Sequence, residues 1–129
     1  MSNLILNSVD IAPLLKARNF FSKILKEAEN DYEKTGAIKA FEFCYELSWK
    51  TLKKVLEVQG KEVNNPRDTF RLAAQWGYIS DPEVWFEFGK ERNLTSHTYN
   101  EDVLHTIFSH LSSFLHHLEL LIAKLEEIK

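Results

Sequence analysis

Apolar side chains recur at helical spacing through the C-terminal part of the chain, from Asn100 almost to the end. Leucines occupy every seventh position, a second apolar set falls between them, and a third set widens the stripe: Leu104, Leu111, Leu118, Leu125; Ile107, Phe114, Leu121, Ile128; Phe108, Leu115, Ile122. This spacing predicts a long helix with a broad apolar face. Part of that face fills the core of its own chain, and whether the rest does the same or contacts a second subunit stays open.

A similar apolar face runs from about Tyr32 to Gln59, and Gly60 is a natural end for that helix. Capping residues, proline and glycine mark three more helices. The first is capped by Ser8 or Asp10, has Pro13 in its opening turn and runs to about Asn30; the third runs from Asn65 and Pro66 to Gly77; the fourth opens at Asp81 and Pro82. The pattern predicts an all-α protein, a mainly antiparallel four-helix bundle with an additional short helix, in a single domain over residues 1–129.

Composition and charge limit the fold classes, the partners and the cellular compartment that can be expected. Four glycines and three prolines in 129 residues argue against a turn-rich all-β fold. A formal net charge of −3 gives no bulk attraction to nucleic acid, so any RNA contact must be a local basic site. The single cysteine, Cys44, lies in an apolar helical stretch and fits the core of a protein in a reducing compartment. With no apolar run of bilayer length and no signal-peptide pattern at the start, we expect a cytoplasmic protein without a membrane partner.

The segment from Arg92 to Tyr99 carries the most informative chemistry. Arg92 suits bidentate capture of phosphate, His97 is a general acid or base near neutral pH, and Tyr99 offers a hydroxyl that can accept a transferred group. Five positions on one helix turn through about 500°, so Arg92 and His97 cannot share a face of a straight helix. We therefore expect Arg92 in the last turn of one helix and His97 and Tyr99 in a short connector before the Asn100 cap. The set indicates phosphate-ester chemistry, although a surface Arg, a hydrogen-bonded His and a half-buried Tyr would also explain it.

Two acidic residues on the second helix are further candidates. Glu42 and Glu46 lie one turn apart, beside Tyr45 and Trp49, and either could support the site or bind substrate. The alternative is a solvated stripe in which Glu46 pairs with Lys50. We expect no metal site, because no histidine lies at ligand spacing from this pair. The histidines of the last helix also lack the spacing of two ligands on adjacent turns.

Three segments in this order resemble the HEPN superfamily (higher eukaryotes and prokaryotes nucleotide-binding), and more narrowly its nucleotidyltransferase substrate-binding proteins. They are Arg92 to Tyr99 with the following Asn100 and Glu101, the run from Phe41 to Lys50, and Asn65-Pro66-Arg67-Asp68. The resemblance extends from about Leu14 to Leu125. One departure is Glu91, where the family motif has an aspartate before the arginine.

The resemblance implies a helical bundle that forms a homodimer and is encoded beside a small nucleotidyltransferase. Many HEPN proteins with Arg-x4-6-His are metal-independent endoribonucleases that act as toxins in toxin–antitoxin pairs. It further implies catalytic roles for Arg92, Asn93 and His97, RNA as substrate, and Tyr99 as the residue to which the partner attaches AMP. Glu42 and Glu46 match the family pattern without an assigned role. No cofactor is expected for this chain, because ATP and Mg²⁺ would belong to the transferase. The alternative is a non-catalytic subunit that binds a substrate or nucleotide for a two-protein transferase.

Overall fold

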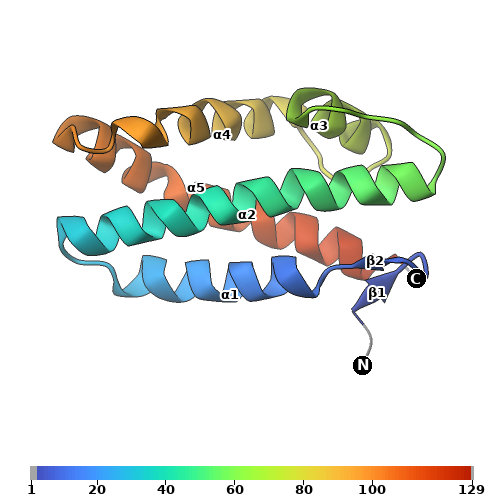
Figure 1. Cartoon of the computed structure of the whole chain (residues 1–129), viewed down its shortest axis with the longest axis horizontal. Coiled ribbons are helices and arrows are strands. Elements are labelled where there is room, and N and C mark those ends of the chain that lie inside the picture. The colour runs from blue at the N-terminus through green and yellow to red at the C-terminus, as the bar shows by residue number, and fades with distance from the viewer. Residues whose placement is uncertain (1–2, 129) are drawn as a thin grey trace.

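The computed structural model describes residues 3–128 and consists almost entirely of helices (Figure 1). The elements are, in chain order, β1 (Leu4–Ile5), β2 (Val9–Asp10), α1 (Ala12–Glu27), α2 (Asp31–Val58), α3 (Pro66–Gln75), α4 (Pro82–Leu94), the 3₁₀ helix η1 (Thr95–His97) and α5 (Glu101–Glu126). The four long helices α1, α2, α4 and α5 lie side by side, and successive members of this set run in opposite directions, while the short α3 lies beside the C-terminal half of α2 (Figure 1). The predicted all-α bundle with one additional short helix is confirmed.

The helix boundaries follow the local capping chemistry. Asn30 and Glu33 form a reciprocal capping box at the start of α2, and the Asn65, Asp81 and Asn100 side chains accept backbone amide hydrogens at the starts of α3, α4 and α5. After α2, Gly60 adopts a positive φ of 84°, a conformation that glycine tolerates best. These starts agree with the predicted ones to within a residue or two.

The N-terminal segment departs from the prediction. Residues 4–10 form a two-stranded antiparallel hairpin that pairs Leu4 with Asp10 and Ile5 with Val9, with a turn through positive-φ residues Leu6 and Asn7. The first helix therefore starts at Ala12. Of the two predicted caps, Ser8 lies in the hairpin, whereas Asp10 accepts a hydrogen bond from the Ala12 amide at 2.9 Å. The helix also ends earlier than expected, at Glu27, because Asn30 serves as the cap of α2.

An aromatic cluster fills the centre of the bundle and sets the distances between helices. The Phe114 ring of α5 packs edge-on against Phe41 of α2, with 4.7 Å between ring centroids, and against Phe88 of α4, with 5.0 Å. Phe70 of α3 stacks on Trp85 of α4 at 4.9 Å. The leucines at the seven-residue repeat of α5 are all buried, and so is Cys44. In the described part of the chain, no helix is long and apolar enough to cross a bilayer.

Candidate functional site

The Arg92 side chain is anchored by α2. Arg92 lies in the last turn of α4, as predicted, and its Nε donates a 3.0 Å hydrogen bond to Glu46 Oε1. The other oxygen of Glu46 accepts from Trp49 Nε1 at 3.0 Å and lies 3.9 Å from Lys50 Nζ. The predicted Glu46–Lys50 pair is therefore present, but the bond to Arg92 is much shorter. In residues 3–128, the two terminal nitrogens of Arg92 have no hydrogen-bond partner, so they are available to a ligand.

The connector after Arg92 is a tight, hydrogen-bonded turn. The Thr95 hydroxyl donates to the Arg92 carbonyl at 2.7 Å, and the Thr98 hydroxyl donates to the Thr95 carbonyl at 3.2 Å. These local bonds end α4 and form η1, which explains why the helix stops between Arg92 and His97. His97 lies at the end of η1 with an exposed ring, and its Nδ1 lies 3.4 Å from the Tyr99 hydroxyl. Tyr99 is itself 83% exposed.

Within one chain, the structure does not bring Arg92 and His97 into contact. Among the described residues no hydrogen bond joins them, because Arg92 points toward α2 while His97 pairs with Tyr99. Asn93 is exposed and lines a groove together with Arg92. The position of Arg92 at the end of α4, and of His97 and Tyr99 in a connector, agrees with the sequence-based expectation.

The two candidate carboxylates have separate surroundings. Glu42 lies one turn before Glu46 on α2, but it pairs with Lys39 at 3.2 Å. Only Glu46 hydrogen-bonds Arg92. The residue before Arg92, Glu91, contacts the His110 ring of α5 and so ties α4 to α5 beside the motif. The structure thus brings Glu46, and not Glu42, into direct contact with Arg92.

A groove of about 560 Å³ opens beside Arg92, between α2, α3 and α4. Two cations that the sequence analysis did not single out, Arg67 and Lys90, share its walls with Arg92 and Asn93. Arg67 belongs to the Asn65-Pro66-Arg67-Asp68 segment, which was one of the three family-like segments and was the only sequence signal for it. Lys90 had no such signal, since it is one of many charged residues on an exposed helix face.

Tyr45 forms part of the groove wall, and its hydroxyl lies close to the backbone of Gly89. A Cβ added to Gly89 would come within 2.7 Å of the Tyr45 hydroxyl, so only glycine leaves room for the phenol at this point. Burial, reinforced by the neighbouring Glu46 carboxylate and partly offset by Arg92, raises the pKa of Tyr45 to about 12. The phenol is therefore neutral at physiological pH and can donate a hydrogen bond.

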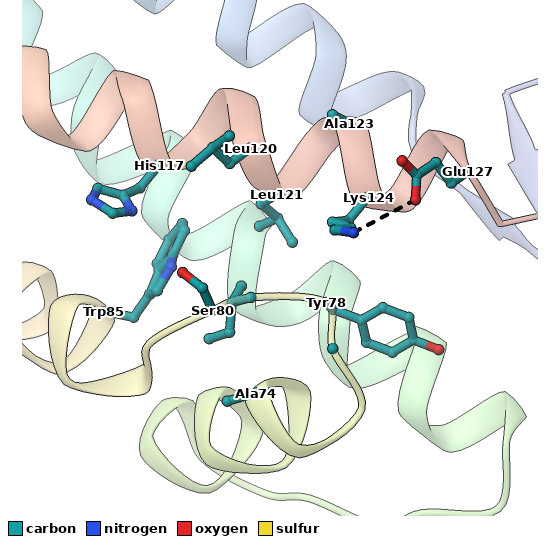
Figure 2. A pocket seen from close by; sticks show the side chains of 12 residues that line it. Ala74, Tyr78, Ser80, Trp85, His117, Leu120, Leu121, Ala123, Lys124 and Glu127 are labelled. Atoms are coloured by element: carbon teal, nitrogen blue, oxygen red, sulfur yellow. Dashed lines mark ion pairs between the residues drawn. The ribbon is translucent and has the colours of Figure 1, made fainter.

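A second pocket, of about 580 Å³, lies at the other end of α5 and contains no residue of the motif. Figure 2 shows His117 and Trp85 on one side of it, Leu120 and Leu121 above, and the Lys124–Glu127 ion pair at the far end. Burial and the neighbouring His116 lower the pKa of His117. The walls are mostly apolar, and the lysine among the lining residues, Lys124, is paired with Glu127. In residues 3–128, no three histidine, cysteine or acidic side chains are grouped so as to hold a metal ion.

The chain is similar to known proteins over most of its length. Residues 9–127 match the family described as "Nucleotidyltransferase substrate binding protein like". A Haemophilus influenzae protein named "Probable ribonuclease HepT" is 34% identical over 85 residues, which is 62% of this chain and 58% of that protein. The chain thus spans less than two thirds of the length of this relative.

Two solved structures share the fold along nearly the whole chain. A Thermus thermophilus protein superposes with a TM-score of 0.81 at 29% identity, covering 87% of this chain and 98% of the other. A Haemophilus influenzae protein superposes with a TM-score of 0.79 at 26% identity, covering 88% and 96%, and is described as having the fold of a substrate binding domain of a nucleotidyltransferase. With the family match over residues 9–127, these likenesses establish that the chain belongs to the nucleotidyltransferase substrate-binding protein-like family, which has the HEPN-like fold.

Proposed function

We propose that this protein is a metal-independent endoribonuclease, the toxin of a toxin–antitoxin pair, which a nucleotidyltransferase partner silences by attaching AMP to Tyr99. One observation carries the proposal: Glu46 holds Arg92 through Nε and leaves its terminal nitrogens free, one short turn before the exposed His97. A guanidinium presented in this way suits a phosphate. The relative named as a ribonuclease supports the nuclease activity, and the family name supports the pairing with a nucleotidyltransferase.

The chemistry assigned to the motif is attack of an RNA 2′-hydroxyl on the adjacent phosphate. The 2′-oxygen forms a bond to phosphorus, the bond to the 5′-oxygen of the next nucleotide breaks, and a 2′,3′-cyclic phosphate results. One imidazole takes the proton of the attacking hydroxyl and another returns a proton to the leaving oxygen. Arg92 stabilises the charge that develops on the phosphorane oxygens, and Asn93, next to it, orients the substrate phosphate.

A homodimer supplies the second imidazole. Each chain offers one His97 at its motif, so a two-fold axis near the connector brings two histidines and two arginines to a shared cleft. Leu94 supports this placement, because it is 46% exposed at the end of α4 and borders a small apolar hollow with Val103 and Ile107. An apolar surface beside the motif is what a second copy would cover.

The silencing step has Tyr99 as acceptor. The phenol oxygen forms a bond to the α-phosphorus of ATP, pyrophosphate leaves, and the phenol proton passes to a base of the partner, which also supplies Mg²⁺. Tyr99 is 83% exposed and so is open to a second enzyme. The attached phosphate would lie beside His97 and would compete with the RNA phosphate for Arg92.

A second candidate function is a non-catalytic subunit that binds a substrate or nucleotide for the transferase. The description of the Haemophilus influenzae structure favours it. In that case Arg92 and His97 bind phosphate without breaking a bond.

Purified protein and RNA, with EDTA present, distinguish the two. We expect the wild type to cleave single-stranded RNA, and Arg92→Ala and His97→Ala to lose about 10²–10⁴-fold in rate while keeping the helical circular dichroism spectrum. Expression in cells with and without the transferase should show growth arrest and RNA loss only without it. A wild-type preparation that binds RNA or nucleotide but leaves RNA intact supports the binding subunit instead.

A further inference from the structure

The groove between α2, α3 and α4 is positively charged in a protein whose net charge is −3. Its lining includes three cations, Arg67, Lys90 and Arg92, and one carboxylate, Glu46. Both oxygens of Glu46 are already engaged, by Arg92 and by Trp49. The excess positive charge is therefore local and faces an open groove, which is the arrangement that concentrates anions.

Arg67 is the cation in this groove without an acidic partner. Its guanidinium carbon lies 4.1 Å above the centre of the Phe86 ring, and in residues 3–128 it forms no ion pair. By contrast, Arg71 on the next turn of α3 pairs with Asp68 at 3.3 Å, and Lys90 pairs with Glu87 at 3.0 Å. Stacking on Phe86 holds the guanidinium plane while its N–H groups stay available to a ligand.

The Tyr45 hydroxyl is a second polar group in the same groove without a protein partner in the described part of the chain. Tyr45 is 5% exposed, it lines the groove, and its hydroxyl has no hydrogen-bond partner among the described residues. No buried polar side-chain atom of residues 3–128 lacks a hydrogen-bond partner, so the hydroxyl itself is not buried and is open to a ligand in the groove. The hydroxyl lies against Gly89, and Arg67 and Arg92 line the same groove, so the groove contains a neutral donor as well as the two guanidinium groups.

We propose that this groove is a phosphate subsite for single-stranded RNA, in which Arg67 and the Tyr45 hydroxyl bind the phosphate next to the one held by Arg92. The inference rests on the proposed function, because Arg92 is assigned there to the reacting phosphate. Arg92 belongs to both places, so a strand whose reacting phosphate lies at Arg92 continues directly into the groove. The planar guanidinium and the neutral phenol donor suit the several acceptor oxygens of a phosphodiester.

Equilibrium binding of a fluorescent oligoribonucleotide with 2′-O-methyl groups throughout tests the subsite. The probe cannot be cleaved, since the attacking hydroxyl is blocked, so binding is read independently of catalysis. We expect Arg67→Ala to weaken binding about tenfold or more. The slope of log affinity against log salt should fall by about 0.7 for the lost contact. The matched control is Arg71→Ala, which removes an arginine from the same helix and from the same aromatic ring but outside the groove, and it should bind like the wild type.

Two further variants sharpen the result. Arg67→Lys should keep the salt slope and lose part of the affinity, because it retains the charge without the planar fork. Tyr45→Phe should weaken binding about two- to tenfold with an unchanged salt slope. Circular dichroism melting checks that each variant is folded.

The outcomes separate this inference from the proposed function. If Arg67→Ala binds RNA like Arg71→Ala while His97→Ala abolishes cleavage, the subsite is wrong and the nuclease stands. If the wild type never cleaves RNA but Arg67→Ala still loses affinity for the probe, the nuclease is wrong and the subsite stands. If Arg67→Ala leaves RNA binding intact and weakens only binding to the transferase, the groove serves a protein partner and the subsite is overturned.

Discussion

Arg92 and Glu46 are 46 residues apart in sequence, and a 3.0 Å hydrogen bond joins Arg92 Nε to Glu46 Oε1 across α4 and α2. The bond engages one edge of the guanidinium and leaves the other edge open. Both side chains are about one third exposed. A partly exposed ion pair adds little to stability, typically about 0–1 kcal/mol, so the main effect of this bond is to orient the Arg92 side chain.

Removing the anchor should therefore reduce activity more than stability. We expect Glu46→Ala to lower RNA cleavage roughly tenfold or more, because a misplaced phosphate-binding group is costly, while the unfolding free energy changes by no more than about 1 kcal/mol. Glu46→Gln keeps an oxygen that can accept from Arg92 and should retain more activity. Glu42→Ala is the matched control, one turn away and paired with Lys39. Equal cleavage rates for Glu46→Ala and Glu42→Ala would contradict the anchoring role.

In a double-mutant cycle, the effect of Gly89→Ala on the unfolding free energy should change sign when Tyr45 is replaced by phenylalanine. Alanine for glycine inside a helix normally stabilises by about 0.5–1 kcal/mol. Here the new Cβ would lie 2.7 Å from the Tyr45 hydroxyl, so we expect Gly89→Ala to destabilise by about 1–3 kcal/mol. In a Tyr45→Phe background the nearest ring atom is at an ordinary 3.5 Å, and the same change should stabilise. Urea unfolding of the wild type, the two single variants and the double variant measures the coupling between the two positions. If the two changes in unfolding free energy are additive, the Tyr45 hydroxyl does not clash with the alanine side chain.

Tyr99 should be the acceptor of the partner's nucleotidyl group. Intact-mass spectrometry after incubation with the transferase, ATP and Mg²⁺ should show a single added nucleotidyl group on the wild type and none on Tyr99→Phe. The control is Tyr32→Phe, since Tyr32 is 91% exposed, more so than Tyr99, but lies at the start of α2 and is not part of the motif. That variant should be modified like the wild type. Modification of Tyr99→Phe to the same extent would mean that the acceptor is another residue.

Leu94 should contribute to the interface of the proposed dimer. Leu94→Asp places a charge on the apolar surface beside the motif, and we expect it to shift the protein toward monomer in light scattering and to reduce cleavage together with assembly. Val58→Asp is a matched control: Val58 is 49% exposed and is likewise the last residue of its helix, so the unfavourable interaction of aspartate with the helix C-terminus is similar in both. A monomeric wild type at micromolar concentration would remove the basis for a shared cleft.

Alkaline pH should destabilise the fold through two buried groups. Burial raises the pKa of the Cys44 thiol to about 12 from an ordinary 9.0, and the pKa of Tyr45 to about 12 from 10.0. Since both values are higher in the folded state, the folded state keeps these protons longer, and stability falls as pH rises from about 9 toward 12. Urea unfolding at pH 7, 9 and 10.5 should show the decline. It should be shallower for Tyr45→Phe than for Tyr32→Phe, and equal slopes would contradict the assignment.

The local pattern by itself determined the helices and, apart from those of α1, their ends. A seven-residue repeat, four side-chain caps and a glycine with positive φ act within a few residues of each other, so the sequence predicts them without knowledge of the fold. The same local chemistry placed Arg92 at a helix end and His97 in a connector. It missed the hairpin of residues 4–10, because pairs of two-residue strands carry almost no periodic signal.

Only the tertiary structure decided which side chains share a site. Glu42 and Glu46 are both candidates in the sequence, and the packing of α4 on α2 brings Glu46, but not Glu42, within hydrogen-bond distance of Arg92. Arg67, Tyr45 and Arg92 come from three different helices, and they share a groove because the rings of Tyr45, Phe70 and Trp85 set how α2, α3 and α4 pack together. Contacts between helices depend on which side-chain shapes fit together, and residues far apart in sequence carry no local pattern that records this fit.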